Sequence, residues 1–111
     1  MPKETTDIVH ICPRQDWQAA QKNGLYRAES LEQIGFIHCS RPDQVVQVGN
    51  HYYRGQPGLV LLWIDPQKVR AEIRWESADG DTFPHIYGPL NIDAVYTVDD
   101  FPPSEDGTFQ L

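Results

Sequence analysis

Positively charged residues are scarce in this chain. Three lysines and six arginines stand against 16 acidic residues, which gives a net charge of −7. Binding to a phosphate backbone requires clustered Lys and Arg, so DNA is not an expected direct partner, and an anionic membrane is disfavoured for the same reason. No run approaches the roughly 20 apolar residues of a membrane span, and the polar N-terminus lacks a signal-peptide core. We therefore expect a cytoplasmic protein.

Cysteine and the common catalytic motifs are also in short supply. The two cysteines, Cys12 and Cys39, are too few for a secreted disulfide framework. Each lies in an apolar run, which predicts a small buried thiol rather than a nucleophile. There is no Gly-rich phosphate loop, G-x-S-x-G elbow, H-E-x-x-H helix or CxxC pair. The spacing of the four histidines does not favour a metal site, so no metal is expected.

What the chain does contain predicts one domain with its own core, because 111 residues match a common domain size. Apolar runs predict buried strands at residues 8–12, 36–40 and 59–64, the last buried on both faces. Alternation predicts a half-solvated strand at 69–75, and a last strand is expected at 92–98. The two prolines of segment 83–90 argue against a central strand there.

Helices are predicted at residues 14–23, which Gly24 ends, and from Pro42 to Gly55, with a shorter turn capped by Ser30 before Gly35. Helices early and strands late predict an α+β domain with a small mixed or antiparallel sheet and two main helices. We expect a disordered N-terminus (1–7), a globular domain (8–98) and a mostly unstructured tail (99–111).

Two histidines lie in the middle of apolar strands, His10 and His38. An unpaired buried polar group costs about 1–3 kcal/mol. Each ring must therefore be hydrogen-bonded or face a cavity. Two interpretations remain open, namely a pair of satisfied core histidines or one polar pocket lined by both rings.

Four further residues are candidates for a binding site. Glu76 falls on the strand face opposite Trp75. There it is either a solvated carboxylate or a pocket carboxylate that stabilises positive charge or accepts a hydroxyl hydrogen bond. His85 and Tyr87 share a face if their segment is extended. Arg54 is either an anion contact or a cation that complements the end of a helix.

The chain resembles a bacterial family of small single-domain proteins, the "domain of unknown function 952". The resemblance covers roughly residues 8–98. The segments that carry it are Ile8–Ile11, Asp16-Trp17, Tyr26 with Ser30-Leu31, Gly35–Ser40, Tyr53–Gln56, Leu59–Leu62 with Ile64-Asp65, Arg74–Glu76 and Phe83–Leu90.

A more distant resemblance is to the ADP-ribosyltransferase-like fold, of the RNA 2′-phosphotransferase type. His10-Ile11-Cys12 would take the place of an H-G-T-like motif, Ile37–Ser40 that of V-H-L-S, and Leu61–Asp65 that of a V-L-x-I-D strand. Glu76 would correspond to the acidic residue found in many transferases of this fold. The Gly-Thr that lets a ribose approach is absent here, as are the winged-helix domain and the added arginines, so RNA is not an expected substrate.

This second resemblance implies cleavage at the N-glycosidic carbon of a nicotinamide nucleotide, with NAD as substrate. Glu76 would stabilise an oxocarbenium-like cation, His10 would hold a ribose hydroxyl, and His38 would contact the nicotinamide or pyrophosphate. The remaining contacts of this small nucleotide-like ligand would come from Ser40, Arg54, His85 and Tyr87. The expected function is an ADP-ribosyl, N-glycosidic or phosphate transferase with an unspecified acceptor. The alternatives are a catalytically silent nucleotide or small-ligand binding module and an interaction protein with structural histidines.

Overall fold

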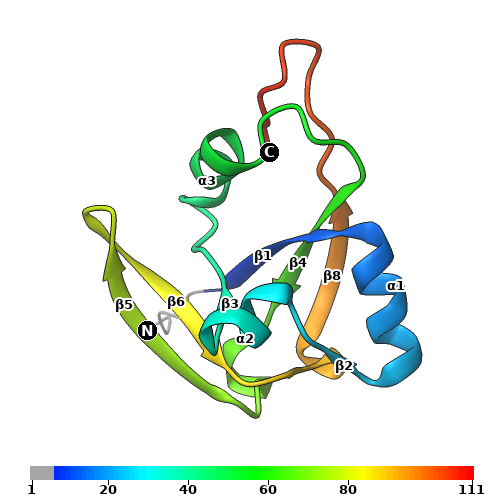
Figure 1. Ribbon diagram of the computed structural model, residues 1–111, viewed down its shortest axis with the longest axis vertical. Helices are drawn as coiled ribbons and strands as arrows, with labels where there is room; N and C mark the ends of the chain where they lie inside the picture. Colours follow the sequence, from blue (N-terminus) through cyan, green and yellow to red (C-terminus); the bar gives the residue numbers. More distant parts are fainter. Residues whose placement is uncertain (1–6) are drawn as a thin grey trace, which may run out of the picture.

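The structure, a computed structural model, describes residues 7–111. Within these residues the chain forms three antiparallel sheets (Figure 1). The first sheet has the strand order β1-β4-β8, the second has the order β3-β6-β5, and a third pairs β2 with β7. The strands are β1 (Ile8–Pro13), β2 (Leu25–Tyr26), β3 (Ile37–His38), β4 (Leu59–Ile64), β5 (Glu72–Ala78), β6 (Asp81–Tyr87), β7 (Leu90–Asn91) and β8 (Val95–Asp100).

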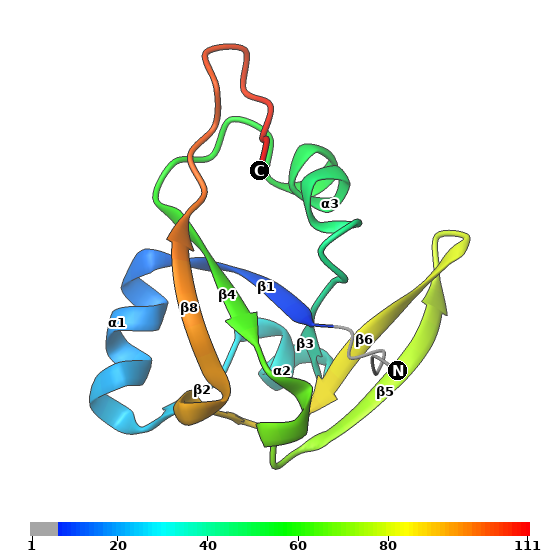
Figure 2. The same ribbon diagram turned by 180° about the vertical axis from the view of Figure 1, so that it is seen from behind.

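In the part of the chain that the structure describes, three helices accompany the sheets, so the α+β class is confirmed. They are α1 (Arg14–Asn23), α2 (Glu29–Ile34) and α3 (Val45–Tyr52), with single 3-10 turns at η1 (Pro66–Lys68) and η2 (Ile92–Ala94). Figure 2 shows α1 beside β8 and α3 at the opposite end of the molecule, next to the C-terminal segment. None of the helices in residues 7–111 is long and apolar enough to cross a membrane.

β4 supplies side chains to two hydrophobic cores. Its alternate residues Val60, Leu62 and Ile64 pack in one core with residues of α1, β2 and the second sheet. Leu59 and Leu61 pack on the other face against residues of α3 and the C-terminal segment. Burial of this strand on both faces is therefore confirmed, and its continuous apolar sequence follows from having a core on each side.

The C-terminal segment departs in part from the expected unstructured tail. After Asp100 it forms no helix or strand, but Phe101 and Phe109 are each only 1% exposed. Their rings stack at a centroid distance of 4.5 Å and lie against Gly49 of α3, where an added Cβ would come within 2.9 Å of Phe101 Cε2. The segment is thus part of the second core. Of the N-terminal prediction (1–7), all but Asp7 lies outside the described residues.

The segment with two prolines does form a central strand, contrary to the prediction. β6 lies between β3 and β5, with Pro84 opposite Trp75. The Pro84 carbonyl accepts a hydrogen bond from Cys39 N at 3.2 Å, and a strand residue's N and O point to the same side. The missing N–H of Pro84 therefore faces the point where the two-residue strand β3 ends, so the sheet loses little pairing.

Two local predictions are also wrong in detail. The apolar run 36–40 pairs as a strand only over Ile37–His38, with one further bridge between Ser40 and Val9. His38 is consequently exposed rather than buried. Ser30 lies inside α2 rather than capping it, and its hydroxyl donates to the Phe36 carbonyl at 2.8 Å.

Candidate functional site

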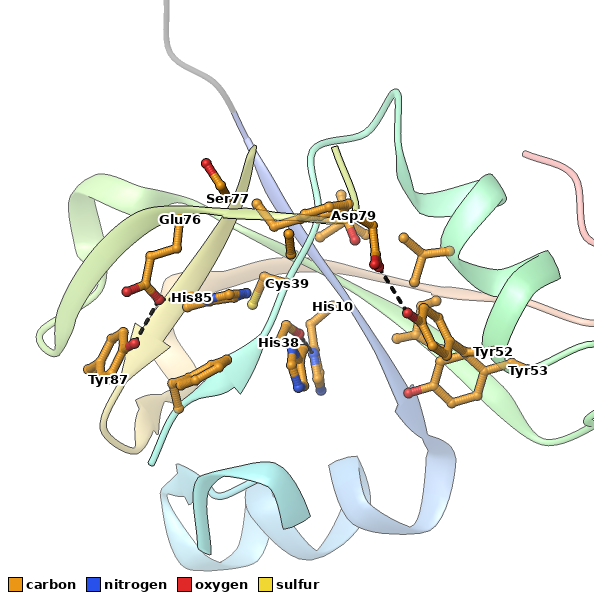
Figure 3. Close-up of a pocket in the computed structure, with 17 residues that line it drawn as sticks. His10, His38, Cys39, Tyr52, Tyr53, Glu76, Ser77, Asp79, His85 and Tyr87 are labelled. Atoms are coloured by element: carbon orange, nitrogen blue, oxygen red, sulfur yellow. Dashed lines mark hydrogen bonds and ion pairs between the residues drawn. The ribbon is translucent and has the colours of Figure 1, made fainter. Parts of the chain in front are cut away.

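A cavity of about 770 Å³ lies between β1, α3 and the second sheet (Figure 3). This volume is in the range of small-molecule sites. The residues that line it are Val9–Ile11 of β1, Phe36 and His38–Ser40, Val48, Tyr52 and Tyr53 of α3 and its end, Glu76–Asp79 of β5 and its turn, and Phe83, His85 and Tyr87 of β6. Six of the seven candidates named from the sequence are in this list, and Arg54 is not.

The register of the second sheet explains why these residues meet. Glu76 is opposite Phe83, and His38 is opposite His85. Directly opposed residues of antiparallel strands point to the same face, and every second residue of one strand does too. Glu76, His85, Tyr87 and His38 therefore share the face toward the cavity, whereas Trp75 points away from it and is 44% exposed.

Glu76 is fixed through one of its two carboxylate oxygens. His85 Nδ1 lies 2.7 Å from Oε1, and the Tyr87 hydroxyl donates to the same oxygen at 2.6 Å. These two hydrogen bonds, with that from Tyr87 the larger influence, hold the pKa of Glu76 below its usual value. The same contact raises the pKa of Tyr87. The result is an ionised carboxylate whose Oε2 makes no hydrogen bond to residues 7–111.

The Glu76 contact also defines which ring nitrogen of neutral His85 carries the proton. A carboxylate only accepts hydrogen bonds, so Nδ1 carries the proton. The His85 side chain is 8% exposed, and Phe36 stacks on its ring at 4.2 Å and 22°. Nε2 has no hydrogen-bond partner in residues 7–111. Since no fully buried polar side-chain atom of this region lacks a partner, Nε2 is not fully buried, and the His85 ring lines the cavity.

His10 is held differently, because both of its ring nitrogens bind within the protein. Nδ1 lies 2.5 Å from the His38 carbonyl oxygen, and Nε2 lies 2.8 Å from the Tyr26 hydroxyl. Since a carbonyl only accepts, Nδ1 donates and Nε2 accepts from Tyr26. Burial lowers the pKa of His10 to about 4, so the ring is neutral near pH 7. His10 thus fixes the backbone of the cavity wall at His38.

The imidazole ring of His38 is not held by hydrogen bonds in the described part of the chain. It lies 5.4 Å from the ring of His85. Partial desolvation and the neighbouring His85 lower the pKa of His38.

Cys12 and Cys39 are free and buried, as expected from the sequence. Burial raises the pKa of Cys12 to about 11 and also raises that of Cys39, which disfavours thiolate chemistry.

The far end of the cavity was not found from the sequence. Figure 3 shows Tyr52, Tyr53 and Asp79 on the side opposite Glu76 and Tyr87, with His10 and His38 between them. The Tyr52 hydroxyl donates to Asp79 Oδ2 at 3.1 Å, which links the end of α3 to the β5–β6 turn. Only the tertiary approach of α3 to this turn creates the contact, although the aromatic pair after an apolar helix is a signal that could have been noted.

Among the described residues, the cavity is lined by aromatic rings and carboxylates and lacks cationic side chains. No Lys or Arg is among the lining residues, whereas Glu76 and Asp79 both are. Arg54 lies beyond α3, where its guanidinium donates to the Asp106 carbonyl at 3.4 Å. Within residues 7–111 no group of three His, Cys, Asp or Glu side chains is placed to hold a metal ion.

Comparison with known proteins finds a matching family model and matching solved structures. The model of a family described as "Protein of unknown function (DUF952)" matches residues 11–98. The crystal structure of CC0527 from Caulobacter crescentus is 34% identical and has a TM-score of 0.87, with 96% of this chain and 95% of that chain covered. The solution NMR structure of CC0527 gives 33% identity and a TM-score of 0.81 over 95% and 92% of the two chains. No curated protein matches.

Proposed function

The chain belongs to the DUF952 family of proteins of unknown function, and we propose that it is a transferase that breaks an N-glycosidic bond. In this proposal NAD or a related nicotinamide nucleotide binds in the cavity and transfers its ADP-ribosyl group to an acceptor. The distant resemblance to the ADP-ribosyltransferase-like fold motivates the choice of donor. The site itself supplies the chemical support.

The observation that carries the proposal is the fixed, ionised carboxylate of Glu76. Loss of nicotinamide leaves positive charge on C1′ of the ribose, and a carboxylate already oriented toward that charge stabilises the transition state without reorganisation. Hydrogen bonds from His85 and Tyr87 to Oε1 provide this orientation and leave Oε2 available. The bond from C1′ to the pyridinium nitrogen breaks with its electron pair on nitrogen, which releases neutral nicotinamide.

The composition of the cavity agrees with the charge of such a donor. The pyridinium ring is a flat cation, which suits carboxylates and aromatic faces such as Phe36 and Phe83. The pyrophosphate would have no cationic partner in the cavity, so it would lie outside. Arg74 is the cation beside the Glu76 end, with its guanidinium 4.3 Å from the centre of the Tyr87 ring.

The geometry changes the role proposed for His10. Both of its ring nitrogens are engaged, so it could hold a ribose hydroxyl only by breaking one of these bonds. We therefore assign His10 a positioning role at the backbone of His38. The unpartnered ring of His38 and the hydroxyl of Ser40 remain as groups for direct contact with the ligand.

The two internal hydrogen bonds of His10 favour a second candidate, a catalytically silent module that binds a nucleotide or another small ligand. A histidine committed to the fold is typical of a structural site, and the cavity would still bind a flat cation. Calorimetric titration with NAD and ADP-ribose tests binding for both candidates. Absence of heat at millimolar ligand would contradict both.

Nicotinamide release from NAD, followed by chromatography, separates the two candidates. We expect Glu76→Gln to lower kcat/KM for release by about 10²- to 10³-fold, the usual effect of removing one preorganised charge-stabilising group. Glu72→Gln is the matched control, because Glu72 lies on the same strand face but pairs with Arg74 outside the cavity. Equal release by wild type and Glu76→Gln would refute the role of Glu76, and binding without any release would leave the silent module.

A further inference from the structure

His85 is buried in the wall of the cavity, and its contacts define one tautomer of the neutral ring. Its Nδ1–H donates to Glu76 at 2.7 Å, so the neutral ring has its lone pair on Nε2. That nitrogen has no partner in residues 7–111 and is not fully buried, and the ring lines the cavity. A carboxylate that fixes one imidazole nitrogen while the other faces a ligand space is the arrangement of a general base.

The ring is also held in place by its neighbours. Phe36 stacks on one face, and Glu76 prevents the ring from flipping, because a flip would break the hydrogen bond. A base that is already oriented avoids the cost of ordering in the transition state. Neither feature is needed for a side chain that only fills space, and an apolar ring would fill this wall without leaving an unpaired nitrogen.

We propose that His85 is the general base of the transfer and takes the proton of an acceptor hydroxyl or water at Nε2. This inference rests on the proposed function and names its acceptor as a neutral O–H group. As the bond from C1′ to nicotinamide breaks, the acceptor oxygen forms a bond to C1′ and its proton moves to Nε2. The proton then leaves to solvent, so that NAD and the acceptor give the ADP-ribosyl product, nicotinamide and one proton.

Charged and titratable groups surround His85. Glu76 and Arg74 face it from β5, His38 faces it from β3, and Tyr87 lies on the same strand. Glu76 stabilises the protonated ring that forms during transfer, while Arg74 and a protonated His38 oppose it. The hydrogen bond to Glu76 therefore supports His85 as the group that accepts the proton.

The test compares His85→Asn with wild type in NAD hydrolysis, with and without azide. Azide is an anionic nucleophile that needs no deprotonation. We expect His85→Asn to lower kcat/KM by about 10²- to 10⁴-fold and to regain activity as azide gives the ADP-ribosyl azide. Azide should not rescue Glu76→Gln. His51→Asn is the matched control, since His51 does not line the cavity.

Nitrogen NMR of the wild-type imidazoles supplies a measurement that survives a poorly folded variant. We expect the neutral His85 ring as the Nδ1–H tautomer, and the Nε2–H tautomer would overturn the proposal. If wild type is active and His85→Asn is equally active, the base assignment alone is overturned. It is also overturned if His85→Asn loses activity that azide does not restore, because His85 would then have a structural role. An inactive wild type would instead refute the proposed function, and the base assignment with it.

Discussion

The two three-stranded sheets share the antiparallel arrangement but differ in what their faces carry. β4, in the centre of the first sheet, has apolar residues on both faces and packs into two cores. β6, in the centre of the second sheet, has Ile86 on the core face and His85 and Tyr87 on the cavity face. The central strand of the first sheet packs on both faces, while the central strand of the second sheet packs on one face and lines the cavity with the other.

Strand register, rather than loop conformation, brings the polar groups of the second sheet together at the cavity. A shift of one residue between β5 and β6 would move Glu76 to the opposite face and away from His85. The apolar face fixes the register, because Ile73 is opposite Ile86 and Ile37 is opposite Ile86 on the other side. Packing on one face of the sheet thus determines which polar groups meet on the other face.

The largest effect should come from truncation in the first sheet. Leu62→Ala should lower the free energy of unfolding by about 2–5 kcal/mol, because it removes buried methyl groups and leaves a cavity. Trp75→Ala in the second sheet, at an exposed position, should cost much less. Urea denaturation of both variants measures this difference. Equal losses would mean that the sheets do not divide their roles in this way.

A somewhat smaller effect should come from His10, the polar residue inside the first sheet. Its pKa of about 4 in the folded protein is below the value of about 6.5 in an unfolded chain. The unfolded state therefore binds a proton first as the pH falls. The stability that depends on neutral His10 should be fully present above pH 6.5. The free energy of unfolding should then drop by about 3 kcal/mol as the pH falls toward 4.

Denaturation at pH 7, 5.5 and 4 measures this slope, with His10→Gln as the comparison. The glutamine keeps polar atoms at the site but cannot titrate, so its slope should be shallower by about one proton in this window. His38, whose pKa is also lowered, contributes in the same direction in both proteins. Identical slopes would show that His10 is already charged in the folded protein.

The smallest effect should come from Tyr87→Phe in the second sheet. Loss of one solvent-screened hydrogen bond should change the free energy of unfolding only slightly, and by less than either change above. The pKa of Glu76 should nevertheless rise, because the Tyr87 hydroxyl is the largest influence that lowers it. A carbon NMR titration of the Glu76 carboxyl measures the change. An unchanged pKa would indicate that His85 alone holds the carboxylate.

The sequence was most informative where local pattern decides structure. The apolar run of β4, the helix that ends at Gly24 and the face shared by His85 and Tyr87 all follow from periodicity. It was least informative where tertiary pairing overrides propensity. The central strand tolerates Pro84 only because β3 ends beside it. No pattern in residues 83–90 reveals where a distant strand ends.

The site was foreseen in part for the same reason. Periodicity placed Glu76 on the strand face opposite Trp75, and apolar context singled out His10 and His38. It could not show that His10 is bound at both nitrogens, because Tyr26 and the His38 carbonyl are supplied by distant segments. Tyr52, Asp79 and Phe36 were missed because their importance depends on which elements face one another across the cavity.

The segment that follows β8 links the end of the chain to this cavity. Phe101 and Phe109 rest against Gly49 of α3, and Phe109 N donates to the Asn50 side chain at 2.7 Å. The same helix presents Tyr52 to the ligand space. A protease that clips the last few residues would therefore free α3 from its anchor and loosen one wall, so damage far from Glu76 in the sequence would reach the site through the backbone.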